Sequence, residues 1–395
     1  MLTYCGVYSP SRSGRERMHI AIGGTRGIPN RYGGFEQCAQ EIAPRFAAAG
    51  HRTTVFNPPS HEYAEPSYRG VEIVRLEVDE ARLGPLGLFL SDWAALRECR
   101  RIEADVMLVL GHTPAGLFFS PASRRPYALV TNIDGMERWR SKFNRLQKTL
   151  LKAGEQAAVR HSDVIIADNV GIANYIRDNY DAASECIEYG AETPTVIKSL
   201  SEVGLGLKPG GYFLCIARIE PENNLEMILE GTARGAPEVP IVVIGGMNTP
   251  HSKRLHAMFG SDPRVLFAGG IYEADRLNAL RYNARVYFHG HSVGGTNPAL
   301  LEAMAARAPI AIHENIFNRA VVGAKTPGFR SADEVARIAA DIPISAEAAH
   351  ANAERIRDHY SWDRVATLYL CAFEKAQRIH RKARAASIDS PDGFL

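Results

Sequence analysis

The sequence has no run of about eighteen apolar residues, so no segment is long enough to cross a bilayer as an apolar helix. Nor does it have a charge excess: 46 Lys and Arg stand against 44 Asp and Glu in 395 residues, which excludes the strongly basic surface of a dedicated nucleic-acid binder. Its six cysteines form no CxxC pair. Neither a zinc site nor a disulfide framework is therefore indicated, and a reducing, cytoplasmic setting is expected. With 46% apolar residues, the chain is long enough for two globular domains.

Short apolar runs rich in β-branched residues alternate with longer helical patterns, which is typical of parallel strands covered by helices on both faces. The series is interrupted near residues 192–211, where Pro194, Pro209 and several glycines occur, and we place a domain boundary there. We therefore expect an α/β protein with two doubly wound, Rossmann-like domains facing a central cleft. The expected strands are 19–23, 53–57, 72–76, 106–110, 127–132, 164–167, 212–217, 241–244, 265–268, 286–289 and 310–313.

This organisation divides the chain into four segments. Residues 1–17 lack the apolar core of a signal peptide, and we expect them to form a disordered extension. Residues 18–192 and 193–360 are the two domains. Residues 361–395 begin with a final helix, capped by Ser361 and long enough to leave its own domain and cross back, followed by a loose tail from Ala383.

A first glycine-rich loop follows the first expected strand, with five glycines among residues 23–34. Glycines at a strand-to-helix turn let the backbone approach a ligand, and the amides at a helix start favour an anion. The alternative is an ordinary turn, but such turns need only about two to six residues. The order Gly23, Gly24, Gly27 does not fit GxGxxG, and the second strand ends at Asn57 without an acid for a ribose. A dinucleotide site is therefore not predicted.

A second glycine-rich loop, residues 289–297, again joins an expected strand to a helix. Thr296 or Asn297 can cap this helix, and the amides from Gly295 to Asn297 would face a phosphate or a sugar hydroxyl. Glu302 lies one turn further along among apolar residues and needs a partner, either an arginine of the core or two ribose hydroxyls. Because both loops follow the carboxyl ends of strands, we expect both to face the cleft.

Three further residues are candidates for ligand contacts. Arg218 follows the first strand of the second domain, where its planar guanidinium can bind a diphosphate; the alternative is a surface salt bridge with Glu220 or Glu222. Tyr272 follows a later strand and borders either the nucleotide base or the core. His112 follows a strand of the first domain and is either an acceptor contact or a structural histidine.

Together these segments resemble the retaining glycosyltransferases of family 4, which have the GT-B fold, over about residues 18–377. GTRGIP at 24–29, YGGFE at 32–36 and GGTNP at 294–298 are similar to a bacterial subgroup that includes rhamnosyltransferases of capsule and exopolysaccharide assembly. SWD at 361–363 resembles the family's final helix.

The resemblance implies that residues 193–360 hold a nucleotide-diphospho-sugar and residues 18–192 the acceptor, and that the sugar is transferred with retention of configuration. Arg218 would bind the diphosphate, and Glu302, as the second acid of the family's Glu-x7-Glu motif, would hold the ribose hydroxyls. The other implied donor contacts are Gly33 and Gly34 against the phosphate and the amides of Gly295, Thr296 and Asn297 at the sugar.

Two positions depart from the family pattern. The first acid of Glu-x7-Glu falls at Gly294, and the lysine usual five residues after the diphosphate arginine is Asn223. Stabilisation of the leaving group would then depend more on Arg218, on helix amides and on Arg26 or Arg31, the last two also being candidate acceptor-side residues.

No DxD motif occurs, and His289 and His291 lack further ligands at metal spacing, so neither a metal nor a cofactor is expected. The resemblance implies front-face attack through an oxocarbenium-like transition state, with amides and Arg218 stabilising the departing diphosphate. Asp134 would contact the sugar or the acceptor; the alternative is a loop cap. A nucleotide-sugar epimerase and a non-catalytic sugar-nucleotide-binding partner are the competing functions on this fold.

A basic amphipathic segment lies in the first domain. Trp139, Phe143, Leu146 and Leu150 share one helical face, and residues 137–160 carry a net charge of +5. Such a helix can lie on an anionic membrane surface, or its apolar face can pack on the sheet. The resemblance favours the membrane, because enzymes of this kind extend sugars on lipid-diphosphate carriers at the cytoplasmic leaflet. We therefore expect peripheral association with the inner face of the cell membrane.

Overall fold

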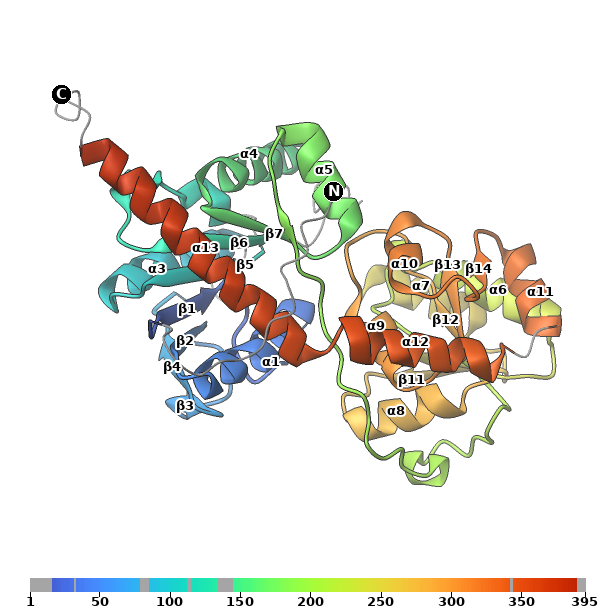
Figure 1. The fold of residues 1–395 in the computed structure, drawn as a ribbon. Helices are drawn as coiled ribbons and strands as arrows, with labels where there is room; N and C mark the ends of the chain where they lie inside the picture. Colours follow the sequence, from blue (N-terminus) through green and yellow to red (C-terminus); the bar gives the residue numbers. More distant parts are fainter. Residues whose placement is uncertain are drawn as a thin grey trace.

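The computed structural model describes residues 16–31, 33–78, 85–111, 115–133, 145–341 and 344–388. The first half of the chain forms an eight-stranded sheet in the order β3-β4-β2-β1-β5-β6-β7-β8 (Figure 1). All its neighbouring strands are parallel except the edge pair of β3 and β4. Its strands are β1 (His19–Gly23), β2 (Arg52–Asn57), β3 (Ser67–Tyr68), β4 (Val71–Arg75), β5 (Val106–Leu110), β6 (Ala128–Ile133), β7 (Val164–Ala167) and β8 (Glu185–Cys186).

The second half forms a fully parallel six-stranded sheet in the order β11-β10-β9-β12-β13-β14. Its strands are β9 (Phe213–Ile216), β10 (Ile241–Ile244), β11 (Val265–Gly269), β12 (Val286–His289), β13 (Ile310–His313) and β14 (Gly328–Phe329). Chain order reverses between β1 and β5 in one sheet and between β9 and β12 in the other. Ligands of doubly wound sheets bind outside the carboxyl ends of strands at such points. The predicted fold class, two doubly wound α/β domains, is confirmed.

Helices cover both sheets because each has one apolar face and must bury it (Figure 1). Those of the first domain are α1 (Gly34–Ala48), α3 (Pro85–Arg101), η1 (Ala115–Phe118), η2 (Ala122–Arg124), α4 (Arg145–His161) and α5 (Val170–Tyr180). Those that follow are η4 (Leu200–Val203), η5 (Pro221–Asn223), α6 (Leu225–Gly235), α7 (Pro250–Phe259), α8 (Ala274–Asn283), α9 (Pro298–Ala305), α10 (Ile316–Val321), α11 (Ala332–Asp341), α12 (Ala346–His359) and α13 (Trp362–Ile388).

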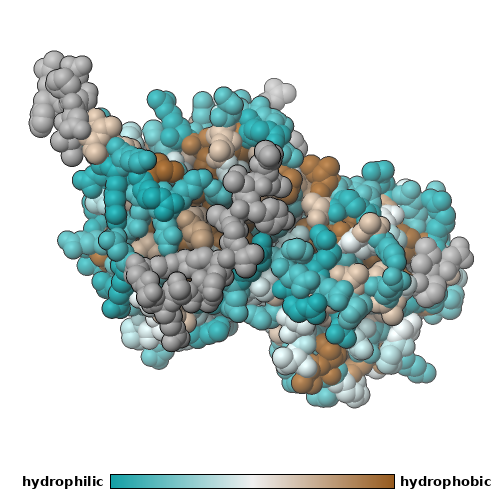
Figure 2. Space-filling view, in the orientation of Figure 1, coloured by the Kyte–Doolittle hydropathy of each residue, from teal (hydrophilic) through white to brown (hydrophobic). Residues whose placement is uncertain are grey.

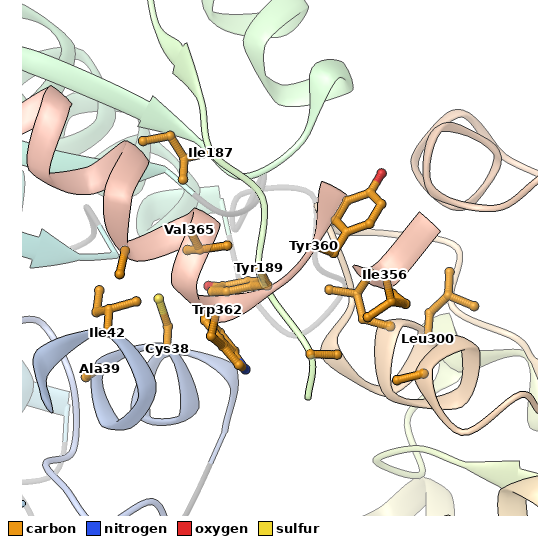
Figure 3. Packing of buried hydrophobic residues seen from close by; sticks show 14 of the residues in the cluster. Cys38, Ala39, Ile42, Ile187, Tyr189, Leu300, Ile356, Tyr360, Trp362 and Val365 are labelled. Carbon is orange, nitrogen blue, oxygen red and sulfur yellow. The ribbon is translucent and has the colours of Figure 1, made fainter. Parts of the chain in front are cut away.

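The chain passes between the two domains twice, and the two passages pack against each other. Tyr189 lies in the first passage. Tyr360 and Trp362 lie in the second passage, where α12 ends and α13 begins (Figure 3). The amide of Ala191 donates to the carbonyl of Tyr360 at 2.8 Å. A Cβ at Gly190 would lie only 2.7 Å from the Trp362 ring, so the close approach requires glycine. These residues belong to one buried apolar cluster that includes both α1 and α9.

Helix α13 crosses from the second domain and lies on the first, beside α1 and β6 (Figure 1). The rings of Phe46 and Phe373 meet edge to face with centroids 5.4 Å apart. The buried Nδ2 of Asn132 donates to the Tyr369 hydroxyl at 2.6 Å. The tail predicted to be loose from Ala383 is instead helical to Ile388, because its alanines and arginine favour helix. Residues 1–15, most of the predicted extension, lie outside the described residues.

Replacing Tyr369 by Phe should lower the free energy of unfolding by about 1–3 kcal/mol, because the buried Asn132 amide loses its hydrogen-bond partner. The exposed Tyr282 on α8 is the matched control: Tyr282→Phe should change stability by less than about 0.5 kcal/mol. Urea denaturation followed by circular dichroism measures both. Equal stability of the two variants would show that α13 does not depend on this contact.

Candidate active site at the domain interface

The starts of α1 and α9 meet across the domain boundary. A Cβ at Gly34 would lie 3.3 Å from Cγ of Pro298, and Nε2 of Gln37 donates to Oε1 of Glu302 at 2.8 Å. The structure thus brings both glycine-rich loops to one place. Two helix N-termini that face each other present amide donors and positive helix-dipole ends, an arrangement suited to an anionic ligand.

Buried polar side chains hold the first loop in shape. Oε1 of Glu36 accepts the Arg26 amide at 2.7 Å. Oδ1 of Asn57 accepts the Ile28 amide at 3.0 Å, and its Nδ2 donates to the Ile28 carbonyl at 2.8 Å. Gly27 has a φ of 90°, and any Cβ there would overlap the Asn57 side chain. Neither role is predicted from the sequence; the only signal for Asn57 is that a polar residue ends an apolar strand.

The two arginines of this loop lie on the surface. Arg31 pairs with Glu62 at 3.2 Å, and both side chains are more than half exposed. Arg26 is also exposed. These exposed positions do not test the two predicted roles of Arg26 and Arg31, which are stabilisation of the leaving group and contact with the acceptor. Asp134 and His112 lie outside the described residues.

The second loop contacts the end of β7 in the first domain. The Thr296 hydroxyl donates to the Asp168 carbonyl at 2.5 Å and accepts from Nδ2 of Asn169 at 3.3 Å. A Cβ at Gly295 would overlap the Asp168 carboxylate, so only glycine fits there. Asn297 caps α9 by accepting the Ala299 amide at 2.9 Å. Thr296 is therefore buried at the domain contact, a role that no local pattern in the sequence reveals.

Glu302 is held by one partner from each domain. The buried Arg281 of α8 forms an ion pair with Oε2, while Gln37 of α1 binds Oε1. An arginine of the core was one of the two partners offered by the sequence, and it is present. The Glu302 side chain remains 28% exposed. A carboxylate has about four lone-pair positions, so Glu302 retains capacity to accept hydroxyl groups.

Arg218 stands at the carboxyl end of β9, beside the second switch point. Its side chain is exposed, and none of the described residues forms an ion pair or hydrogen bond with the guanidinium. In particular, no salt bridge links it to Glu220 or Glu222 within the described chain. Its carbonyl accepts Nδ2 of the buried Asn223 at 2.6 Å. The Asn223 side chain is thus buried within the turn after β9 and stabilises the backbone of that turn.

The turn after β9 is tied to the loop after β12. Both the amide and the hydroxyl of Ser292 donate to the Glu222 carbonyl, at 3.0 and 2.8 Å. Nδ2 of Asn224 donates to the Gly290 carbonyl at 2.8 Å. These hydrogen bonds fix the turn after β9 relative to the loop after β12, and these two segments flank the point where chain order reverses.

Tyr272 projects from the surface with 84% of the residue exposed, and its ring lies against Gly270. Within the described part of the chain, no group of three His, Cys, Asp or Glu side chains is placed to hold a metal ion.

Two family models match the chain in succession. Residues 17–192 match a model described as a domain of unknown function, DUF1972, and residues 205–347 match one described as glycosyl transferases group 1. No curated protein matches the sequence.

Similar solved structures cover nearly the whole chain. A sucrose-phosphate synthase from Thermosynechococcus elongatus has a TM-score of 0.73 and 17% identity, covering 94% of this chain and 100% of that one. The Anabaena protein HepE, in complex with UDP-glucose, has a TM-score of 0.69 and 16% identity, covering 91% and 100%. A trehalose 6-phosphate synthase from Burkholderia multivorans has a TM-score of 0.66 and 12% identity, covering 96% and 100%. Together with the group 1 match, these likenesses confirm the GT-B fold and the prediction of a glycosyltransferase enzyme.

Replacing Asn57 by Ala should lower the free energy of unfolding by about 1–3 kcal/mol, because the enclosed Ile28 amide and carbonyl lose their partners. Asn179 also hydrogen-bonds a backbone carbonyl, at 3.0 Å, but is exposed, so Asn179→Ala should cost less than about 0.5 kcal/mol. Chemical denaturation compares the two. If Asn57→Ala unfolds like the parent, the loop does not depend on this side chain.

Proposed function

We propose that this glycosyltransferase moves a sugar from a nucleotide-diphospho-sugar to a lipid-linked or polysaccharide acceptor, with retention of configuration, and that rhamnose is the candidate sugar. One observation carries the proposal: the starts of α1 and α9 face each other, and Arg218, at the carboxyl end of β9, has no partner for its guanidinium among the described residues. The sugar and the acceptor rest on the resemblance to bacterial rhamnosyltransferases. HepE, which has a similar fold, was solved with UDP-glucose and supports the donor class.

In this proposal the donor lies at the second switch point. Arg218 binds the diphosphate, the amides of Gly295 and Asn297 face the sugar, and Glu302 accepts ribose hydroxyls with its free lone pairs. The ion pair with Arg281 fixes the orientation of that carboxylate. Gly33 and Gly34 approach the phosphate from the first domain.

The chemistry follows from where charge develops. As the bond to the sugar breaks, negative charge builds on the departing diphosphate and positive charge on the sugar ring. The Arg218 fork and the N-terminal amides of α9 stabilise that negative charge without rearrangement. The acceptor hydroxyl attacks from the same face as the leaving group and gives its proton to the departing phosphate oxygen, so no protein nucleophile is needed.

A donor screen tests the function. Thermal shift with UDP-, dTDP- and GDP-sugars identifies the base, and the hit is then incubated with and without acceptor. Transfer to an acceptor supports the proposal. Conversion of the nucleotide sugar without acceptor indicates an epimerase, and binding without turnover indicates a non-catalytic partner; either outcome overturns it.

Arg218→Lys should lower kcat/KM by at least about tenfold, roughly 1.4 kcal/mol, because lysine lacks the planar fork that binds phosphate oxygens. The fold should be unaffected, since the side chain is exposed and its guanidinium forms no hydrogen bond or ion pair with the described residues. Arg254, exposed in the same domain and paired with Glu226 at 3.0 Å, provides the control variant Arg254→Lys. Steady-state kinetics that do not distinguish the two variants would leave Arg218 outside the site.

The acceptor side of the proposal is a membrane-bound lipid carrier. An exposed apolar patch joins α3, η1 and α4, with η1 in contact with both helices. Figure 2 shows a mostly hydrophilic face interrupted by small apolar areas. Among the described residues, no helix is long and apolar enough to cross a membrane. The patch consists of Leu90, Trp93, Leu117, Phe118 and Leu150.

Basic side chains border this patch. Arg97 lies over the Trp93 ring at 5.1 Å, and Lys148 and Lys152 share α4 with Leu150, which is 45% exposed. The rest of the predicted amphipathic face, Trp139 to Leu146, lies outside the residues whose side chains are described. Apolar side chains ringed by cations fit an anionic bilayer surface.

The double reversal Lys148→Glu/Lys152→Glu should abolish co-sedimentation with vesicles of anionic phospholipid at low salt, because each lysine adds about 1 kcal/mol of attraction. The same charge change on the second domain, Lys208→Glu/Lys253→Glu, is the control and should leave binding intact. Parent protein that stays in the supernatant, or reversals of equal effect, would remove the membrane from the proposal.

A further inference from the structure

Three rings are stacked at the end of β12. The rings of His289 and His291 lie 4.4 Å apart and only 14° from parallel, and Tyr287 continues the stack 6.2 Å from His289. Alternate residues of a strand point to the same face, which places Tyr287 and His289 on one side, and the loop carries His291 onward in line. The stack therefore ends at the second switch point, beside the proposed donor.

The ring nitrogens of this stack lack hydrogen bonds. His289 is 1% exposed, and neither of its nitrogens has a partner within the described structure; the same is true of the enclosed Nδ1 of His291. Burial lowers the pKa of His289 well below its usual range. Burial, followed by the charge of Arg218, lowers the pKa of His291 to about 3. Both rings are thus neutral near pH 7, and each carries one N–H.

Two neighbouring segments, the start of α10 and the turn after β9, fix the backbone around His291. Its carbonyl accepts Nδ2 of Asn315 at 3.0 Å and Nδ2 of Asn318 at 2.8 Å, both from the start of α10. Its neighbours Gly290 and Ser292 are bonded to the turn after β9, as described above. The backbone of His291 is thus fixed, its ring is stacked on His289, and no described residue forms a hydrogen bond with the ring, which suits a binding site because such sites need preorganised groups.

His291 also lies near the positive charge of Arg218, the proposed diphosphate-binding residue. Arg218 is close enough to influence its pKa, and both residues lie at the carboxyl ends of β9 and β12, the two strands that flank the switch point. Asn223 stands where related enzymes have a second cation, but it is buried and bonded to the Arg218 carbonyl. The diphosphate would otherwise meet a single cation.

We propose that His291 is a further diphosphate-binding residue, whose neutral imidazole donates a hydrogen bond to the leaving phosphate beside Arg218. This inference rests on the proposed function. A neutral donor binds the substrate modestly and binds the departing diphosphate more strongly as its charge grows, which favours turnover. A purely structural buried histidine would be expected to have its nitrogens satisfied by protein.

Three variants test the role of His291. His291→Phe keeps an aromatic ring on the stack but removes the donor, His291→Gln keeps an N–H donor, and His289→Phe removes the enclosed nitrogens one ring deeper. Isothermal titration with UDP, dTDP and GDP measures the Kd of each folded variant, and thermal unfolding verifies that it is folded. We expect the Kd of the best diphosphate to rise about tenfold or more in His291→Phe, and by less than about threefold in the other two.

The outcomes separate the inference from the function. If the parent binds a nucleoside diphosphate and His291→Phe binds it equally well, the inference is overturned and the proposed function stands. If His291→Phe fails to fold, a rise in the Kd for His291→Ala compared with His291→Gln supports the inference, and equal values overturn it. A parent that binds none of the three diphosphates overturns both.

Discussion

The close approach of the two chain passages between the domains is the constraint on which the site depends. Gly190 admits the Trp362 ring, and the hydrogen bond from Ala191 to Tyr360 joins the passages. The packing extends without a break into α1 and α9 (Figure 3). Because α1 and α9 both pack into this shared cluster, their N-terminal ends are held opposite each other. A larger residue at 190 would therefore act on the active site from a distance.

The electrostatics of the interface follow from that placement. Both facing helix starts are positive, yet each also carries an acid, and an unpaired acid would repel a diphosphate. Both acids have partners in the structure: Glu36 accepts the Arg26 backbone amide, and Glu302 forms an ion pair with Arg281. Both carboxylates are thus engaged in structural contacts, whereas the Arg218 side chain is exposed and has no hydrogen-bond or ion-pair partner among the described residues. Desolvation and the charge of Arg218 both lower the pKa of the partly buried His291, so its imidazole is neutral beside that guanidinium.

Much of this could be predicted from the sequence, because parallel strands buried on both faces appear as continuous apolar runs. Strands such as β5 and β12 were predicted to the residue, whereas β3, β8 and β14 have two residues each and show no periodicity. Both glycine-rich loops were identified, since their signal is local. The partners of the loops were not: Thr296 meets Asp168 across 128 residues, and such a contact depends on how the domains pack.

Two residues, Asn223 and Gly294, depart from the pattern of the family that the sequence resembles, and each has a specific role in the local backbone structure. Asn223, at the position where the resemblance implies a lysine, is buried, and its amide donates to the Arg218 carbonyl. Gly294 has a φ of 119°, where a side chain would be strained although space is open around it. A glutamate there would require another loop conformation, and with it another position for Gly295 against Asp168. The positive φ of Gly294 and the close approach of Gly295 to Asp168 are therefore two features of one loop conformation.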